Sequence, residues 1–190
     1  MDPLSALRSA IDLVQVPSRV RIARSLPLPD GMELLLRIAA GDGDCATEAA
    51  AATGRDADFV REAATFFIEQ VLLEPGADSY RVLGVAPEAR TEDLRRNLAL
   101  LMRCLHPDAS DDSHRSVFAG RITGAWEDLK TPQRRAMYDA ALAQAQAPSA
   151  SSRKRRRYSR RMRSIGGTGR FEAAKVTTLL RRWIGPRNRV

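Results

Sequence analysis

Cysteine, aromatic residues and long apolar runs are all scarce in this 190-residue sequence. The two cysteines, Cys45 and Cys104, stand far apart and form no C-x-x-C pair, which excludes a cysteine zinc module and argues against a disulfide scaffold. Aromatic residues make up only 5% of the chain, so its cores must be modest and mainly aliphatic. The longest apolar stretches are interrupted by charge and too short to span a bilayer. The N-terminus lacks the pattern of a signal peptide, and we expect a cytoplasmic protein.

Positive charge is concentrated at one end of the chain. Residues 146–190 hold 14 of the 31 Lys and Arg residues but one of the 23 acidic residues, a net charge of +13. The preceding 145 residues carry a net charge of −5, against +8 for the whole chain. The pattern indicates a slightly acidic globular body followed by a strongly basic tail.

The first 75 residues have the apolar spacing of amphipathic helices. Two stripes are Leu4, Leu7, Ile11 and Val14, and then Val60, Ala64, Phe67 and Val71. The turn sequence EPGAD ends this region and marks the clearest boundary in the body. We expect residues 1–75 to form a small helical bundle of unknown role, in which we find no site.

The next region predicts two longer helices that pack as an antiparallel hairpin. The first has one apolar face and ends before a proline, because the residue preceding proline is pushed out of the α region. A polar loop follows, and then a second apolar face of matching length. The two faces are Leu94, Leu98, Leu101 and Leu105, and then Phe118, Ile122, Ala125, Trp126 and Leu129.

The loop between these helices contains His106, Pro107 and Asp108, whose chemistry needs an explanation. A metal site needs three or four ligands, and His114 is the only other histidine. Cys104 and His106 are two positions apart on a helix end and do not face each other, so a nucleophilic pair is excluded. We therefore expect no enzyme activity, no catalytic residue, no metal and no cofactor. Taken alone, the tripeptide is also explained as a helix terminator.

Its surroundings favour another interpretation. The segments SYRVLGV, PEARTEDLRRN, LHPD and AWEDLKTPQRRAMYDAAL occur in the order found in the J domain of the DnaJ family of co-chaperones. The resemblance covers about residues 78–142, a third of the chain, and rests on several separate motifs. It implies an all-α fold in which the predicted hairpin is helices II and III of a J domain.

The resemblance also implies a partner. In that family the His-Pro-Asp loop meets the ATPase domain of a DnaK-type heat-shock chaperone and triggers ATP hydrolysis. Carried over, the chaperone-contact residues are His106, Pro107 and Asp108, with Arg95, Arg96 and Arg103 on helix II. Arg134 and Arg135, within the helix IV signature QRRAMYD, are predicted as a secondary contact surface.

Helix II departs from the family pattern. Leu98, Ala99, Leu100 and Cys104 stand where an aromatic residue and lysines or arginines are common. Fewer charges predict weaker docking at physiological salt. Leu100 and Met102 also fall off the core stripe, which is explained either by ordinary scatter or by a covering element, the N-terminal bundle or a C-terminal helix.

The rest of the chain lacks a zinc module and a glycine/phenylalanine-rich linker, which resembles the specialised class of the family. Residues 146–168 have the composition of a disordered basic linker, and residues 169–184 that of a basic amphipathic helix. The tail predicts contact with nucleic acid, a ribosome or an anionic membrane surface, or else is a solvated appendage or docks on the body. Its candidate residues are Arg153, Lys154, Arg155, Arg156, Arg157, Arg160, Arg161 and Arg163.

Two functions follow from these patterns. The first is a cytoplasmic co-chaperone that stimulates a DnaK-type ATPase through residues 106–108. The alternative is a protein associated with nucleic acid or the ribosome, which uses the basic tail and keeps the J-like domain as a scaffold. A pure scaffold has no need of an intact His-Pro-Asp motif, and this favours the first.

Overall fold

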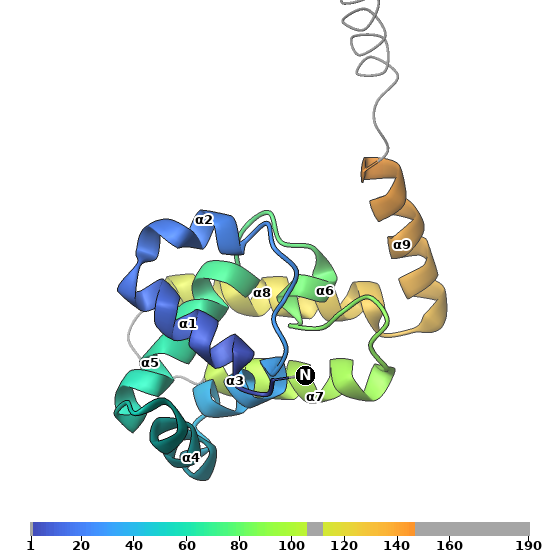
Figure 1. Cartoon of the computed structure of the whole chain (residues 1–190). Helices are drawn as coiled ribbons and strands as arrows, with labels where there is room; N and C mark the ends of the chain where they lie inside the picture. Colours follow the sequence, from blue (N-terminus) through green and yellow to red (C-terminus); the bar gives the residue numbers. More distant parts are fainter. Residues whose placement is uncertain (1, 106–111, 147–190) are drawn as a thin grey trace, which may run out of the picture. The chain divides into compact units, whose positions relative to one another are not determined.

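The computed structural model describes residues 2–105 and 112–146 (Figure 1). The chain divides into two compact units, Met1–Leu142 and Ala143–Val190, and nearly all described residues belong to the first. The elements are α1 (Ser5–Gln15), η1 (Pro17–Arg19), α2 (Val20–Ala23), α3 (Met32–Ala39), α4 (Gly43–Thr53), α5 (Ala57–Phe67), η2 (Ile68–Leu72), α6 (Ser79–Val82), α7 (Thr91–Cys104), α8 (Asp112–Leu129) and α9 (Pro132–Gln146). No strand occurs in the described part of the chain, and the all-α prediction is confirmed.

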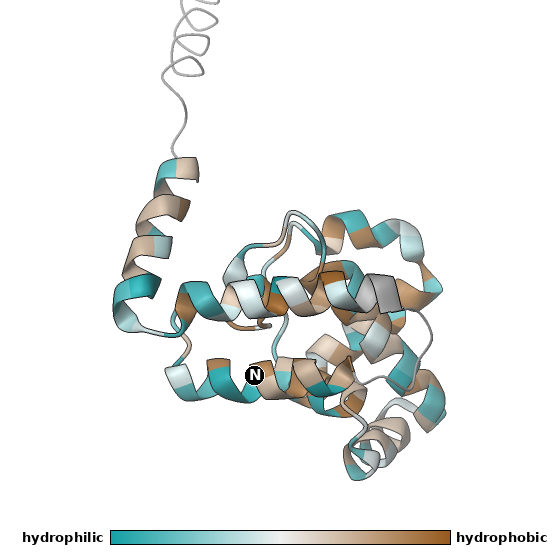
Figure 2. Ribbon diagram, turned by 180° about the vertical axis from the view of Figure 1, so that it is seen from behind, coloured by the Kyte–Doolittle hydropathy of each residue, from teal (hydrophilic) through white to brown (hydrophobic). Residues whose placement is uncertain are grey.

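The N-terminal helices pack around α5, which contacts α1, α3 and α4. Local signals set where α5 begins: Gly54 ends α4 in the left-handed region (φ 64°), and the Asp56 carboxylate then accepts a hydrogen bond from the Asp58 amide at 2.8 Å. The apolar stripe of α5 is buried at Val60, Ala64 and Phe67. Hydrophobic and hydrophilic residues alternate along the helices in Figure 2, as expected where amphipathic helices surround a common core.

The later helices form the predicted hairpin. α7 and α8 contact each other and run in opposite directions (Figure 1). α7 begins where the Arg90 amide donates to the Asp93 carboxylate at 3.3 Å, which satisfies one free donor of its first turn. The apolar faces of the two helices are buried at Leu94, Leu101, Ile122, Ala125 and Leu129.

The bundle and the hairpin share one hydrophobic core. At Gly84 (φ 64°), a Cβ atom would lie 3.5–3.6 Å from side-chain atoms of Met32, Leu36 and Leu72, so helices from the first part pack directly over this turn of the second. The Arg121 guanidinium also donates a hydrogen bond to the Leu73 carbonyl. Residues on both sides of the EPGAD turn are therefore parts of one packed body.

The described helices include none that combines the length and the apolar character needed to cross a membrane.

The turn before α3 provides a test of how closely the start of the chain packs on the N-terminal bundle. Gly31 has φ 84°, and a Cβ atom there would lie 1.9 Å from the Pro3 carbonyl oxygen. Gly41 has nearly the same backbone, φ 86°, but open space around it. We expect Gly41→Ala to lower the free energy of unfolding by about 1–2 kcal/mol, the cost of a left-handed alanine. Gly31→Ala should cost about 2–5 kcal/mol, because the clash is added.

Urea denaturation of both variants measures the difference. Equal losses of stability in the two variants would contradict the close approach of Pro3 to Gly31.

Candidate functional site

The predicted contact loop lies between the helices α7 and α8. His106, Pro107 and Asp108 lie outside the described residues, as do the tail residues 153–163. The structure does place the helix on each side of the loop: α7 ends at Cys104, and α8 begins at Asp112. The candidate site is therefore assessed from α7 and from the α9 surface that the motifs also indicated.

One flank of α7 is open to solvent. Arg95, Ala99, Met102 and Arg103 are exposed, and the Met102 side chain retains 44% of its accessible surface. These positions follow helical spacing, so they form one continuous strip, which we call the open flank. Among the described residues, neither Arg95 nor Arg103 has an ion-pair partner within 4.0 Å. Within residues 2–105 and 112–146, the open flank thus presents two positive charges without an ion-pair partner.

Arg96 differs from these two arginines. Its guanidinium contacts the Glu33 carboxylate of α3 at 3.1 Å and the Asp93 carboxylate at 2.8 Å. The sequence predicted Arg96 as a contact residue together with Arg95 and Arg103. It gave no signal for the pairing with Glu33, because that pairing depends on a contact between helices distant in the sequence. The structure pairs Arg96 with α3 and leaves its side chain partly exposed.

Leu100 and Cys104 lie on the same stripe as Arg96 and are half-buried against the core. The Cys104 sulfur is 3.9 Å from the Leu36 carbonyl oxygen of α3, and burial raises the pKa of this thiol to about 11. Because α3 packs on α7, we call the stripe of Leu100, Cys104 and the Glu33-paired Arg96 the covered flank; Leu100 and Cys104 are half-buried, whereas the Arg96 side chain stays 44% exposed beside Glu33. Of the two explanations for the off-stripe apolar residues, a covering element accounts for Leu100, whereas Met102 is exposed.

The two arginines predicted on α9 have different surroundings. Arg134 is exposed and pairs with Glu127 at 2.9 Å. Arg135 lies over the Tyr80 ring, with 5.3 Å from its guanidinium carbon to the ring centroid. It also donates hydrogen bonds to the Tyr80 hydroxyl at 3.0 Å and to the Ala89 carbonyl at 2.8 Å, and a further one to the Pro87 carbonyl. The guanidinium nitrogens of Arg135 thus donate hydrogen bonds within the protein.

Arg135 belongs to a polar lock between α6 and α9. The Ser79 amide donates to the Tyr138 hydroxyl at 2.7 Å, and the Tyr80 hydroxyl donates to Asp139 at 2.6 Å. Burial, followed by the hydrogen bond to Asp139, raises the pKa of Tyr80. The sequence identified this segment by its QRRAMYD signature but did not predict that it holds α9 against α6. The hydrogen-bond partners of Arg135, Tyr138 and Asp139 are more than forty residues away, so no local pattern reveals them.

Metal-binding chemistry has no support in the described region. Within residues 2–105 and 112–146 no three His, Cys, Asp or Glu side chains gather closely enough to hold an ion. What α7 offers chemically is a charged and partly apolar surface suited to binding another macromolecule.

The comparisons with known proteins concern this same region. The family model "DnaJ domain" matches residues 78–139. The chain is 37% identical over 62 residues to the chaperone protein DnaJ of Rickettsia akari, which covers 33% of this chain and 17% of that protein. It is 35% identical over 68 residues to DnaJ homolog dnj-20 of Caenorhabditis elegans (35% of this chain, 19% of that protein). It is 32% identical over 63 residues to the curved DNA-binding protein of Coxiella burnetii (33% and 20%).

The matches cover the part of the chain that the sequence motifs indicated. The resemblance to a J domain is confirmed over residues 78–139. The chain spans a fifth or less of the length of these relatives. No solved structure matches the chain.

The two α9 arginines generate a paired prediction. Arg135→Ala removes hydrogen bonds from a charged donor to three oxygens, so we expect it to lower the free energy of unfolding by about 2–3 kcal/mol. Arg134→Ala removes only an exposed ion pair and should change stability by about 0.5 kcal/mol or less. Thermal and urea denaturation of both variants provide the measurement. A similar loss in both, or none at Arg135, would show that the lock between α6 and α9 contributes little.

Proposed function

We propose that this chain is a co-chaperone that stimulates ATP hydrolysis by a DnaK-type chaperone, because residues 78–139 match the DnaJ domain family model. The match at residues 78–139 carries the proposal, since it includes an intact His106-Pro107-Asp108 motif. The packed α7–α8 hairpin supports it further, because the two helices hold both ends of the segment that contains the motif.

The residue types of the motif suit a binding role. Pro107 restricts the backbone of the loop, which lowers the entropy lost when a partner docks. Asp108 supplies an ionised acceptor for a partner's arginine. Arg95 and Arg103 add exposed positive charge on the adjacent helix. In this proposal ATP is bound and hydrolysed by the chaperone, so the chain needs neither a catalytic residue nor a cofactor of its own, and it acts in the cytoplasm.

Substitution at His106 tests the proposal. We expect His106→Gln to abolish stimulation of a DnaK-type ATPase in a steady-state assay, because the contact residue is lost. Circular dichroism and the melting temperature should stay nearly unchanged, since all elements of the shared core are retained. A variant that stimulates as strongly as the unsubstituted chain would contradict the proposed role of the motif, and an unfolded variant would contradict a pure contact role.

The basic tail supports a second, separate function. Residues 153–163 contain eight Lys and Arg residues in eleven positions, in the sequence RKRRRYSRRMR. Such runs bind phosphate backbones through counterion release, with little dependence on base sequence. The interleaved Tyr158 adds one aromatic ring for stacking on a base. We propose that the tail delivers the co-chaperone to nucleic acid or ribosomes; an anionic membrane surface is the other polyanion that it would fit.

Deletion of residues 147–190 separates the two functions. Full-length protein should bind DNA or RNA with a log–log salt slope of roughly −4 to −7, corresponding to about five to eight phosphate contacts. The truncated chain should lose this binding and keep ATPase stimulation. Stronger stimulation by the truncated chain would instead indicate a tail that folds back on the body. Absence of salt-sensitive binding to DNA, RNA and anionic vesicles would leave the tail a solvated appendage.

A further inference from the structure

The N-terminal bundle covers one flank of α7 with a contact that is both apolar and charged. Glu33 of α3 holds Arg96 at 3.1 Å, and the Leu36 carbonyl lies 3.9 Å from the Cys104 sulfur. Leu100 lies between Arg96 and Cys104 on the same helical stripe and packs against the core. The first and last of these three successive turns, at Arg96 and Cys104, therefore contact α3, and the middle one packs against the shared core.

This cover is continuous with the shared hydrophobic core. Leu36, whose carbonyl faces Cys104, also packs over Gly84 together with Met32: a Cβ atom at Gly84 would lie 3.5–3.6 Å from their side-chain atoms. Separating α3 from α7 would expose both the covered flank and this part of the shared core to water, at a cost proportional to the apolar area exposed. Leucine at position 100 and cysteine at position 104 suit such a contact, whereas lysine or arginine would bring an unpaired charge into it.

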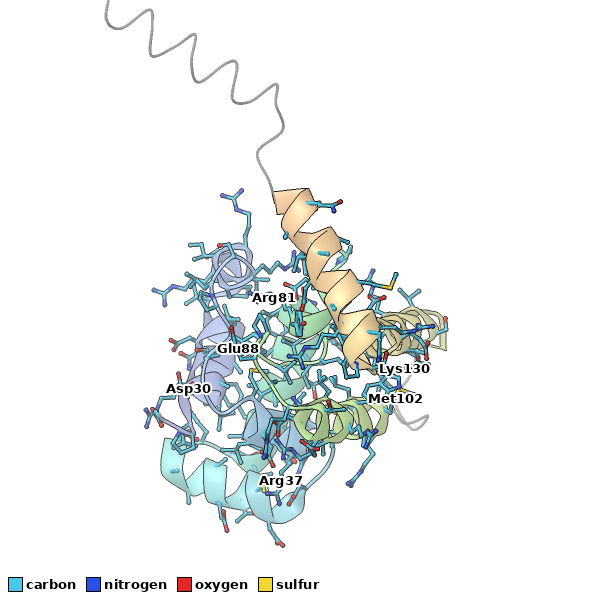
Figure 3. All side chains as sticks on the ribbon, turned by 90° about the vertical axis from the view of Figure 1, so that its right-hand side faces the viewer. Asp30, Arg37, Arg81, Glu88, Met102 and Lys130 are labelled. Carbon is cyan, nitrogen blue, oxygen red and sulfur yellow. The ribbon has the colours of Figure 1, made fainter. Side chains whose placement is uncertain are left out.

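The open flank has the features that the covered flank lacks. Arg95 and Arg103 are exposed about two helical turns apart, with the small side chain of Ala99 and the exposed thioether of Met102 between them. Met102 lies at the surface of the hairpin in Figure 3. Two cations around a small apolar strip fit an acidic protein surface that also presents an apolar side chain.

Building on the proposed function, we infer that a DnaK-type chaperone docks on α7 through the open flank alone, because α3 occupies the covered flank. The N-terminal bundle then determines which side of α7 the partner reaches. Arg95 and Arg103 contribute to docking, while Arg96 contributes to the internal contact with α3.

Matched charge removals on the two flanks test this inference. Affinity of the full-length chain for a DnaK-type ATPase domain would be measured by titration calorimetry for Arg95→Gln, Arg103→Gln and Arg96→Gln. We expect the first two variants to weaken binding by about twofold to fivefold each, the usual size of an exposed charge contact, and Arg96→Gln to leave it unchanged. A loss at Arg96 equal to that at Arg95 would overturn the inference. No binding by the unsubstituted chain would instead overturn the proposed function.

The cover itself can be tested without any chaperone. In an Ala99→Cys variant, alkylation by iodoacetamide would be followed for each cysteine by peptide mass spectrometry. The raised pKa of Cys104, about 11, leaves little thiolate at pH 8, so we expect position 99 to react at least about tenfold faster than Cys104. The Cys104 rate should keep rising toward pH 11. Equal rates at pH 8 would show that α3 does not cover this flank, and the inference would fail whatever the chaperone measurement gave.

Discussion

The packing of Met32, Leu36 and Leu72 over the turn at Gly84 is the contact on which the rest of the structure depends. It joins helices that precede the EPGAD turn to the segment from which α7 extends, so one core serves both parts of the chain. The left-handed backbone of Gly84 allows this approach, since another residue would adopt φ 64° only at a cost. Through this contact the position of α3 determines which flank of α7 is exposed.

Charged groups have two different roles around this core. Most ion pairs, such as that between Arg134 and Glu127, are exposed and contribute little to stability. The hydrogen bonds of Arg135 to the Tyr80 hydroxyl and the Ala89 carbonyl are part-buried, that to the Pro87 carbonyl is exposed, and together they hold α9 against α6 and the turn that follows it. The α7 charges that have no ion-pair partner in the described part of the chain, Arg95 and Arg103, are the ones proposed to act in recognition.

Local patterns in the sequence were sufficient to predict the fold class and the hairpin. The spacing of Leu94 and Leu101 identified the buried face of α7, and the ordered motifs identified the DnaJ domain. The pairing of Arg96 with Glu33 could not be predicted, because neither residue carries a local signal for a contact between distant helices. For the same reason the sequence predicted Arg135 only as part of a contact surface. Its hydrogen-bond acceptors in the structure are the Tyr80 hydroxyl and the Ala89 and Pro87 carbonyls.

The shared core has a consequence for the synthesis of this protein. The chain emerges from the N-terminus, so α1 to α5 are complete before Gly84 and α7 have been translated. At about 5–20 residues per second, the apolar side of α3 waits several seconds for the surface that covers it. During that interval the parts of Met32 and Leu36 that face the Gly84 turn in the finished protein lack that cover. A protein proposed to recruit a chaperone would thus pass through a stage at which apolar surface of α3 that its own later residues cover is still open to a chaperone.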